Sequence, residues 1–130
     1  MKRGDLIVVY GTLRPGHRAN GYLASRAKHL GKTRFSAMMY TLGGFPGVKL
    51  VGEGNFMSDG PTVVGDLYEI ENEGLPQILD TYEGYPNLYG RRKVEVEDGR
   101  KAWVYTYNHA VSDSALIPSG DWNNVQAAAR

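Results

Sequence analysis

Cysteine is absent from this chain of 130 residues. Disulfide bonds and thiolate chemistry are therefore excluded, and so is the class of small secreted domains held together by disulfides. Long hydrophobic runs are missing as well, because the first apolar segment, "DLIVVY", ends at Gly11. This segment is too short for a signal peptide or a membrane-spanning helix, so we expect a cytoplasmic protein that makes no contact with a membrane.

An excess of charge of one sign is also missing, because the formal net charge is +1. The chain has no overall basic footprint, and we expect no nucleic-acid partner. The charges are unevenly spread: residues 1–50 hold nine Lys or Arg and one acid (+8), and residues 51–130 hold six basic and thirteen acidic residues (−7). A basic first half favours a small anionic ligand near the first loop, unless the two halves simply intermix in the fold.

Histidines are few and widely separated, which bears on metal and hydrolase chemistry. His17, His29 and His109 have no ligand spacing with one another or with nearby acidic residues, so we expect no metal site. The chain also lacks the G-x-S-x-G pattern in which a serine hydrolase presents its nucleophile.

Hydrophobic residues make up 42% of the sequence and charged residues 22%, as in an ordinary soluble globular protein. At this length we expect a single domain over residues 1–130. The apolar and alternating runs predict strands over 6–10, 34–42 and 63–70, a short strand after Phe45, and a hairpin within 89–108. Asp98 and Gly99 are expected to form a two-residue turn in that hairpin.

Two segments predict short helices. In residues 19–29 apolar side chains recur at roughly helical spacing, and Asn20 is a candidate N-cap. In residues 74–85 apolar residues share one face, Pro76 suits the first turn, and Gly84 ends the helix. Mostly antiparallel strands with two short helices indicate an α+β fold, which we expect to be a small closed β-barrel.

The loop "VYGTLRPGHR" after the first strand has the glycine spacing of a nucleotide-binding P-loop. A P-loop needs Lys and then Ser or Thr directly after its second glycine, and His17 and Arg18 stand at those positions. The nucleotide interpretation therefore fails. The loop either forms only a tight turn or presents backbone N–H groups to another small anion, which Arg14 could also contact.

Glu83 is the acidic residue that stands out. It ends the second predicted helix and is surrounded in sequence by Tyr82, Tyr85 and Tyr89. A carboxyl group among aromatic rings loses solvent, and its pKa rises toward the range that suits proton transfer near neutral pH. The alternative is a solvent-facing glutamate, although a negative charge at a helix C-terminus is mildly unfavourable.

Four segments together resemble the gamma-glutamylcyclotransferase-like family, in particular its gamma-glutamylamine cyclotransferase branch. These segments are "VYGTLRPGHRAN" near the N-terminus, "GDLYEI" at 65–70, "LDTYEGYPNLYGRRKVEV" after it, and "SGDW" at 119–122. The resemblance covers nearly the whole chain. It implies a compact barrel of mostly antiparallel strands with flanking helices, in agreement with the pattern of predicted elements.

The resemblance also implies an activity and a site. Enzymes of this family cleave gamma-glutamyl conjugates without a cofactor or metal: the α-amine attacks its own γ-carbonyl, and 5-oxoproline and an amine are released. By resemblance, Glu83 would be the general acid and base that takes a proton from the α-ammonium and returns one to the leaving nitrogen. The substrate-binding residues would be Tyr10, Gly11, Thr12, Leu13 and Tyr89.

Two alternatives stay open at the level of sequence. Strand alternation sends Arg91 and Arg92 to opposite faces, and we favour Arg92 as the inward one because it shares a face with Val94. Such an arginine beside Glu83 would lower the pKa of its carboxyl group. The alternative to an enzyme is a non-catalytic module that binds a small anion on the same fold. The sequence indicates neither the oligomeric state nor the leaving amine.

Overall fold

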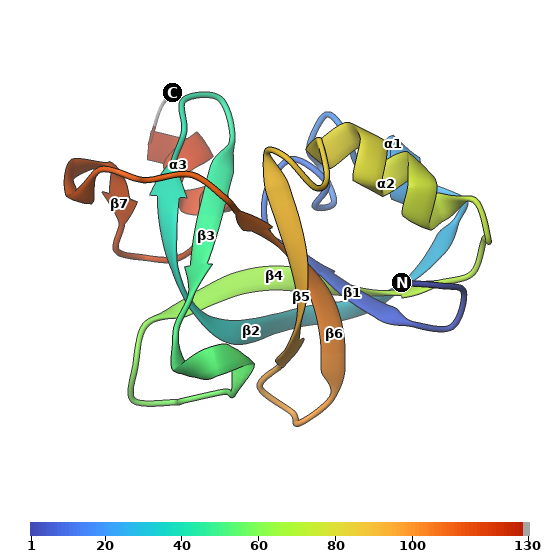
Figure 1. The fold of residues 1–130 in the computed structure, drawn as a ribbon, viewed down its shortest axis with the longest axis horizontal. Helices are drawn as coiled ribbons and strands as arrows, with labels where there is room; N and C mark the ends of the chain where they lie inside the picture. The colour runs from blue at the N-terminus through green and yellow to red at the C-terminus, as the bar shows by residue number, and fades with distance from the viewer. Residues whose placement is uncertain (129–130) are drawn as a thin grey trace.

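The computed structural model describes residues 1–128, which form a curled half-barrel of strands with short helices beside it (Figure 1). The strands are β1 (Leu6–Val9), β2 (Ala27–Thr41), β3 (Pro46–Leu50), β4 (Thr62–Ile70), β5 (Tyr89–Glu95), β6 (Lys101–Tyr107) and β7 (Leu116–Ile117). The helices are α1 (Gly21–Ala24), α2 (Leu75–Glu83) and α3 (Trp122–Ala128), and two 3-10 turns cover Gly52–Gly54 and Asp113–Ala115. The predicted α+β class is confirmed.

The strand order is β3-β2-β4-β1-β6-β5, and β7 adds to β2. Every pairing is antiparallel except that of β1 with β6. Over the part of the chain that the structure describes, this order has two free ends, β3 and β5, so hydrogen bonds do not close the barrel that the sequence suggested.

β1 is buried on both faces, as its continuous apolar run predicts. Ile7 and Val9 belong to a core between the sheet and the helices α1 and α2. Val8 and the following Tyr10 point the other way, into a second core enclosed by the curled sheet and covered at one end by Trp122. β1 therefore joins the two cores, and the loop that follows it lies at their junction.

The predicted helix over 74–85 is confirmed as α2, with Pro76 in its first turn and Gly84 in the left-handed region (φ 67°) at its end. The helix predicted over 19–29 is wrong beyond its first turn. Strand β2 begins at Ala27, because Ala27–His29 pair with the end of β4, and this tertiary pairing overrides an imperfect helical spacing. No helix within residues 1–128 has the length and apolar content needed to cross a membrane.

The predicted strands are all present, with β2 longer than expected. The turn of the β5–β6 hairpin has three residues instead of two. The amide of Val96 donates to the carbonyl of Arg100 at 2.9 Å, and Gly99 sits between them at φ 95°. This is the common three-residue hairpin loop with glycine in the left-handed position.

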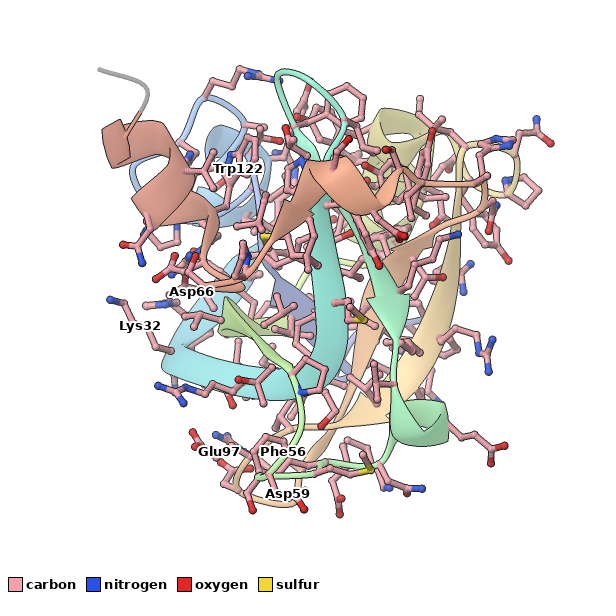
Figure 2. All side chains as sticks on the ribbon, turned by 90° about the vertical axis from the view of Figure 1, so that its left-hand side faces the viewer. Lys32, Phe56, Asp59, Asp66, Glu97 and Trp122 are labelled. Carbon is pink, nitrogen blue, oxygen red and sulfur yellow. The ribbon has the colours of Figure 1, made fainter. Side chains whose placement is uncertain are left out.

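A buried ionic cluster fastens the loop after β1 to the rest of the molecule. Arg14 is 1% exposed; its Nε donates to Asp66 of β4 at 2.7 Å, and its Nη1 donates to Asp121 at 2.9 Å. His29 of β2 contacts the second Asp66 oxygen at 2.9 Å. Arg14 is thus a structural cation, and the suggestion that it contacts a bound anion is wrong. Figure 2 shows Asp66 and Trp122 on the same side of the molecule.

We expect Arg14→Met to lower the free energy of unfolding by about 3–5 kcal/mol, because it leaves the buried Asp66 carboxylate without its main partner. Urea denaturation measures this difference. The matched control is Arg100→Met, which removes an exposed ion pair with Asp98 and should leave stability nearly unchanged. Equal losses in the two variants would contradict a structural role for Arg14.

Candidate active site

A cavity of about 240 Å³ opens at the junction of the two cores. Every site residue predicted from the sequence lines it, although these residues come from the loop after β1, the end of α2 and the start of β5. The lining residues are Val8, Val9, Tyr10, Gly11, Thr12, Leu13, Arg18, Phe45, Pro46, Tyr82, Glu83, Leu88, Tyr89 and Tyr105. The cavity is largely apolar with a few polar groups, as small-molecule sites usually are.

The loop after β1 turns its carbonyl groups toward the protein. The carbonyls of Gly11, Thr12 and Leu13 accept hydrogen bonds from Arg14 N (3.1 Å), Ala19 N (3.0 Å) and Asn20 Nδ2 (2.9 Å). Asn20 therefore braces this loop instead of capping α1. We find no acceptor among residues 1–128 for the amides of Gly11, Thr12 and Leu13. Successive free amides in a buried loop are suited to an anion.

Gly11 is required by the close approach of its loop to Pro46. A Cβ atom at this position would lie 2.7 Å from Pro46 Cγ and 2.8 Å from Pro46 Cδ, well inside contact distance. The missing side chain therefore keeps both the loop geometry and the space beside it. The hydroxyl of Thr12 contacts Tyr82 OH at 2.7 Å and joins the loop to α2.

Glu83 is the last residue of α2 and faces the cavity without a partner. No hydrogen bond or ion pair connects its carboxylate to another residue in the described part of the chain. Burial raises the pKa of Glu83 to about 7, and no cation opposes this shift. The carboxyl group is therefore close to half-ionised at neutral pH, the state from which it can either accept or donate a proton.

Two tyrosines of the cavity, Tyr10 and Tyr89, hold their hydroxyl protons and donate them to backbone carbonyls. Tyr89 OH donates to Pro46 O at 2.7 Å, and Tyr10 OH donates to Tyr105 O at 2.8 Å. Burial, together with the Glu83 charge, raises the pKa of both Tyr10 and Tyr89. These side chains make the wall dry and rigid. Of the three tyrosines near Glu83 in sequence, Tyr85 lies outside the cavity and is 37% exposed.

Neither arginine of β5 enters the cavity. Arg91 forms a two-point ion pair with Asp80 (2.9 and 3.0 Å) and lies over the Tyr85 ring. Arg92 is exposed, so the expectation that it points inward is wrong. Arg92 does share a face with the buried Val94, but this face of β5 reaches the surface at the open edge of the half-barrel.

The structure adds residues that the sequence argument did not select. Tyr105 of β6, Phe45 and Pro46 before and in β3, and Leu88 before β5 complete the walls. Their apolar or aromatic character is ordinary for core positions, so no local signal identified them. Arg18 was considered only as a mismatch to the P-loop, yet it is the one basic residue among the lining residues.

The histidines all contact structural partners. His17 contacts the side-chain amide of Asn123, His29 contacts Asp66, and His109 packs edge-on against Tyr107. Within residues 1–128, no group of three His, Asp or Glu side chains is arranged to hold a metal ion.

Residues 7–124 match the model of a family described as "Gamma-glutamyl cyclotransferase, AIG2-like". The chain belongs to this family. A Vibrio cholerae protein that is named as a gamma-glutamylcyclotransferase is 36% identical to this chain over 119 residues, which cover 90% of this chain and 94% of the relative. The gamma-glutamylcyclotransferase family protein YtfP of Escherichia coli K12 is 34% identical over 117 residues, covering 89% and 94%. The family predicted from the sequence motifs is thereby confirmed.

Solved structures agree on the fold. An uncharacterized protein from Pyrococcus horikoshii has a TM-score of 0.77 at 22% identity, with 96% of this chain and 95% of that chain covered. The solution structure of Escherichia coli YtfP has a TM-score of 0.68 at 30% identity, covering 93% of this chain and 98% of that chain.

The family match and the names of the relatives identify the protein as a gamma-glutamylcyclotransferase-like enzyme. Membership of this family favours catalysis over the binding-module alternative.

The Glu83 carboxyl group should affect stability in a pH-dependent way. Its pKa is raised to about 7 in the fold against 4.5 as the ordinary value, so ionisation opposes folding increasingly as pH rises from about 4.5 to 7. We expect Glu83→Gln to match the wild type below pH 4.5 and to be more stable above pH 7, by up to about 3 kcal/mol. Urea denaturation at pH 4 and pH 8 tests this, and equal stability at pH 8 would contradict it.

Proposed function

We propose that this protein cleaves small gamma-glutamyl conjugates by intramolecular cyclisation, with Glu83 as general acid and base. The products would be 5-oxoproline and a free amine or amino acid. The observation that carries the proposal is the unpartnered Glu83 carboxyl, whose pKa burial raises to about 7 inside a cavity next to free loop amides. In a module that only binds an anion, the Glu83 carboxylate would repel the ligand, because both carry a negative charge.

The charges of a gamma-glutamyl group fit the two polar sides of the cavity. Its α-carboxylate needs oriented N–H donors, which the amides of Gly11, Thr12 and Leu13 can supply. Its α-ammonium needs a carboxylate, and Glu83 is the only acidic residue among the lining residues. The aliphatic chain between these groups would lie against the apolar wall formed by Pro46 and Tyr89.

The proposed reaction is a proton relay combined with ring closure. Glu83 accepts a proton from the α-ammonium, and the resulting amine attacks the γ-carbonyl of the same molecule. A carbon–nitrogen bond forms in the ring, the bond to the leaving nitrogen breaks, and Glu83 returns the proton to that nitrogen. The ring nitrogen gives its second proton to the departing amine, which leaves as an ammonium ion. Holding the chain folded supplies much of the rate, since effective molarities of such closures reach about 10⁵ M or more.

Glu83→Gln should lower kcat for a gamma-glutamyl amino acid by about 100-fold or more, because the amide keeps the shape but accepts no proton. Mass detection of 5-oxoproline measures turnover. The matched control is Glu73→Gln, an exposed substitution of the same kind just before α2, which should retain wild-type turnover. Near wild-type turnover in Glu83→Gln would remove Glu83 from the mechanism.

The acid limb of the pH profile should report the same carboxyl group. We expect kcat/KM to fall below an apparent pKa of about 7, because protonated Glu83 cannot act as the base. Arg92→Met should leave this limb in place, since Arg92 lies outside the cavity. An acid limb near 4.5 would show that the site is wetter or more positive than its lining indicates.

Gly11→Ala should weaken binding of 5-oxoproline at least about tenfold, as measured by calorimetry. The added methyl group collides with the Pro46 ring, so either the loop or Pro46 must move and the amides lose their arrangement. Gly21→Ala is the control, because a Cβ there meets nothing within 4 Å. Unchanged binding in a folded Gly11→Ala variant would mean that the loop is only a turn.

A further inference from the structure

Arg18 has a position unlike that of any other cation in the described chain. It is the only Lys or Arg among the lining residues of the cavity. It is exposed, and we find no hydrogen bond or ion pair from its side chain to residues 1–128. By contrast, Arg14 of the same loop is buried between two carboxylates. Arg18 is therefore a cation available to a ligand.

The burial of the lining residues gives the cavity a floor and a mouth. Gly11, Thr12 and Tyr89 are buried, whereas Arg18 and Leu88 are the exposed members of the lining. A gamma-glutamyl group that reaches the loop amides and Glu83 occupies the floor. The group attached to its γ-carbonyl then extends toward the mouth, where Arg18 lies.

In the proposed reaction, Arg18 binds neither charged group of the glutamyl moiety. The α-carboxylate is assigned to the loop amides and the α-ammonium to Glu83. No ion pair joins Arg18 to the Glu83 carboxylate in the described chain, so the guanidinium is not committed to the proton-transfer group. Arg18 lines the same cavity as the apolar side chains of Leu88 and Phe45, so a ligand carboxylate bound there is partly removed from water, which strengthens its attraction to the guanidinium.

We infer that Arg18 binds a carboxylate of the leaving group, so that the enzyme selects gamma-glutamyl conjugates of amino acids over those of simple amines. This inference rests on the proposed function and deepens it. A guanidinium makes charge-assisted, often two-point hydrogen bonds to a carboxylate, and an uncharged amine offers it no partner. The sequence left the leaving group open, although the resemblance is to the gamma-glutamylamine branch of the family, and a carboxylate on the leaving group makes it an amino acid.

The test compares two substrates of nearly equal size, gamma-glutamylalanine and gamma-glutamylalaninamide, which differ at the leaving group by one carboxylate. In the wild type, kcat/KM should be at least about tenfold higher for gamma-glutamylalanine. Arg18→Gln should bring this ratio close to one, and the acid limb of the pH profile should stay where it is. High salt should narrow the wild-type preference, because the mouth is exposed.

Arg34→Gln is the matched control, because it removes the same charge from an exposed position on β2 outside the cavity and should keep the wild-type ratio. Equal use of both substrates by the wild type would overturn the inference. Equal losses on both substrates in Arg18→Gln would overturn it too, because they would assign Arg18 to the glutamyl carboxylate.

Calorimetry separates this inference from the proposed function. If the wild type releases no 5-oxoproline, the same two ligands stay intact and are titrated into the wild type and into Arg18→Gln. If the wild type releases no 5-oxoproline but the alanine conjugate still binds more tightly through Arg18, the proposed function fails and the Arg18 assignment stands. If neither ligand binds, or both bind alike, the Arg18 assignment is overturned.

Discussion

The arrangement of the site depends on the burial of the Arg14 charge. A guanidinium that is 1% exposed is stable only when carboxylates surround it, and Asp66 and Asp121 come from β4 and from the segment before α3. Arg14 follows directly on the loop residues Gly11–Leu13, and its amide bonds to the carbonyl of Gly11. Fixing Arg14 therefore fixes the loop, and the loop amides stay free for a ligand.

This constraint also explains two segments that lie outside the cavity. Asp66 belongs to "GDLYEI" and Asp121 to "SGDW", the segments that supported the family resemblance without an evident chemical role. Gly120 lies so close to β4 that a Cβ atom would overlap Thr62 O, and its carbonyl accepts a hydrogen bond from Val64 N at 2.8 Å. The segment before α3 thus packs against β4 and positions Asp121 to bind Arg14 of the first loop.

The polar groups of the cavity divide into satisfied and unsatisfied ones. The hydroxyls of Tyr10 and Tyr89 donate to carbonyls, and that of Tyr82 bonds to Thr12. The unsatisfied groups are the loop amides, the Glu83 carboxyl and the Arg18 guanidinium. Two further buried groups without hydrogen-bond partners, Arg14 Nη2 and Trp122 Nε1, lie outside the cavity lining. The unsatisfied groups of the cavity itself form a pattern of charge that fits the proposed small zwitterionic ligand.

Much of this fold follows from local signals in the sequence. The continuous apolar run of β1 marked a doubly buried strand, and Pro76 and Gly84 bounded α2, because these signals are local and act through backbone geometry. The residues predicted to form the site, Tyr10–Leu13, Glu83 and Tyr89, were selected by family resemblance and by the aromatic surroundings of one acid. All of them line one cavity.

Which charges face that cavity depends on contacts that form only in the folded chain. Four arginines, Arg14, Arg18, Arg91 and Arg92, carry the same charge, and contacts in the fold separate them. Arg14 pairs with the distant Asp66 and Asp121 and Arg91 with Asp80, whereas Arg18 and Arg92 are exposed and only Arg18 lines the cavity. The change from helix to strand after Ala24 has the same origin, since β2 forms by pairing with β4. Long-range pairing is not encoded in local spacing, so it appears only once the chain is folded.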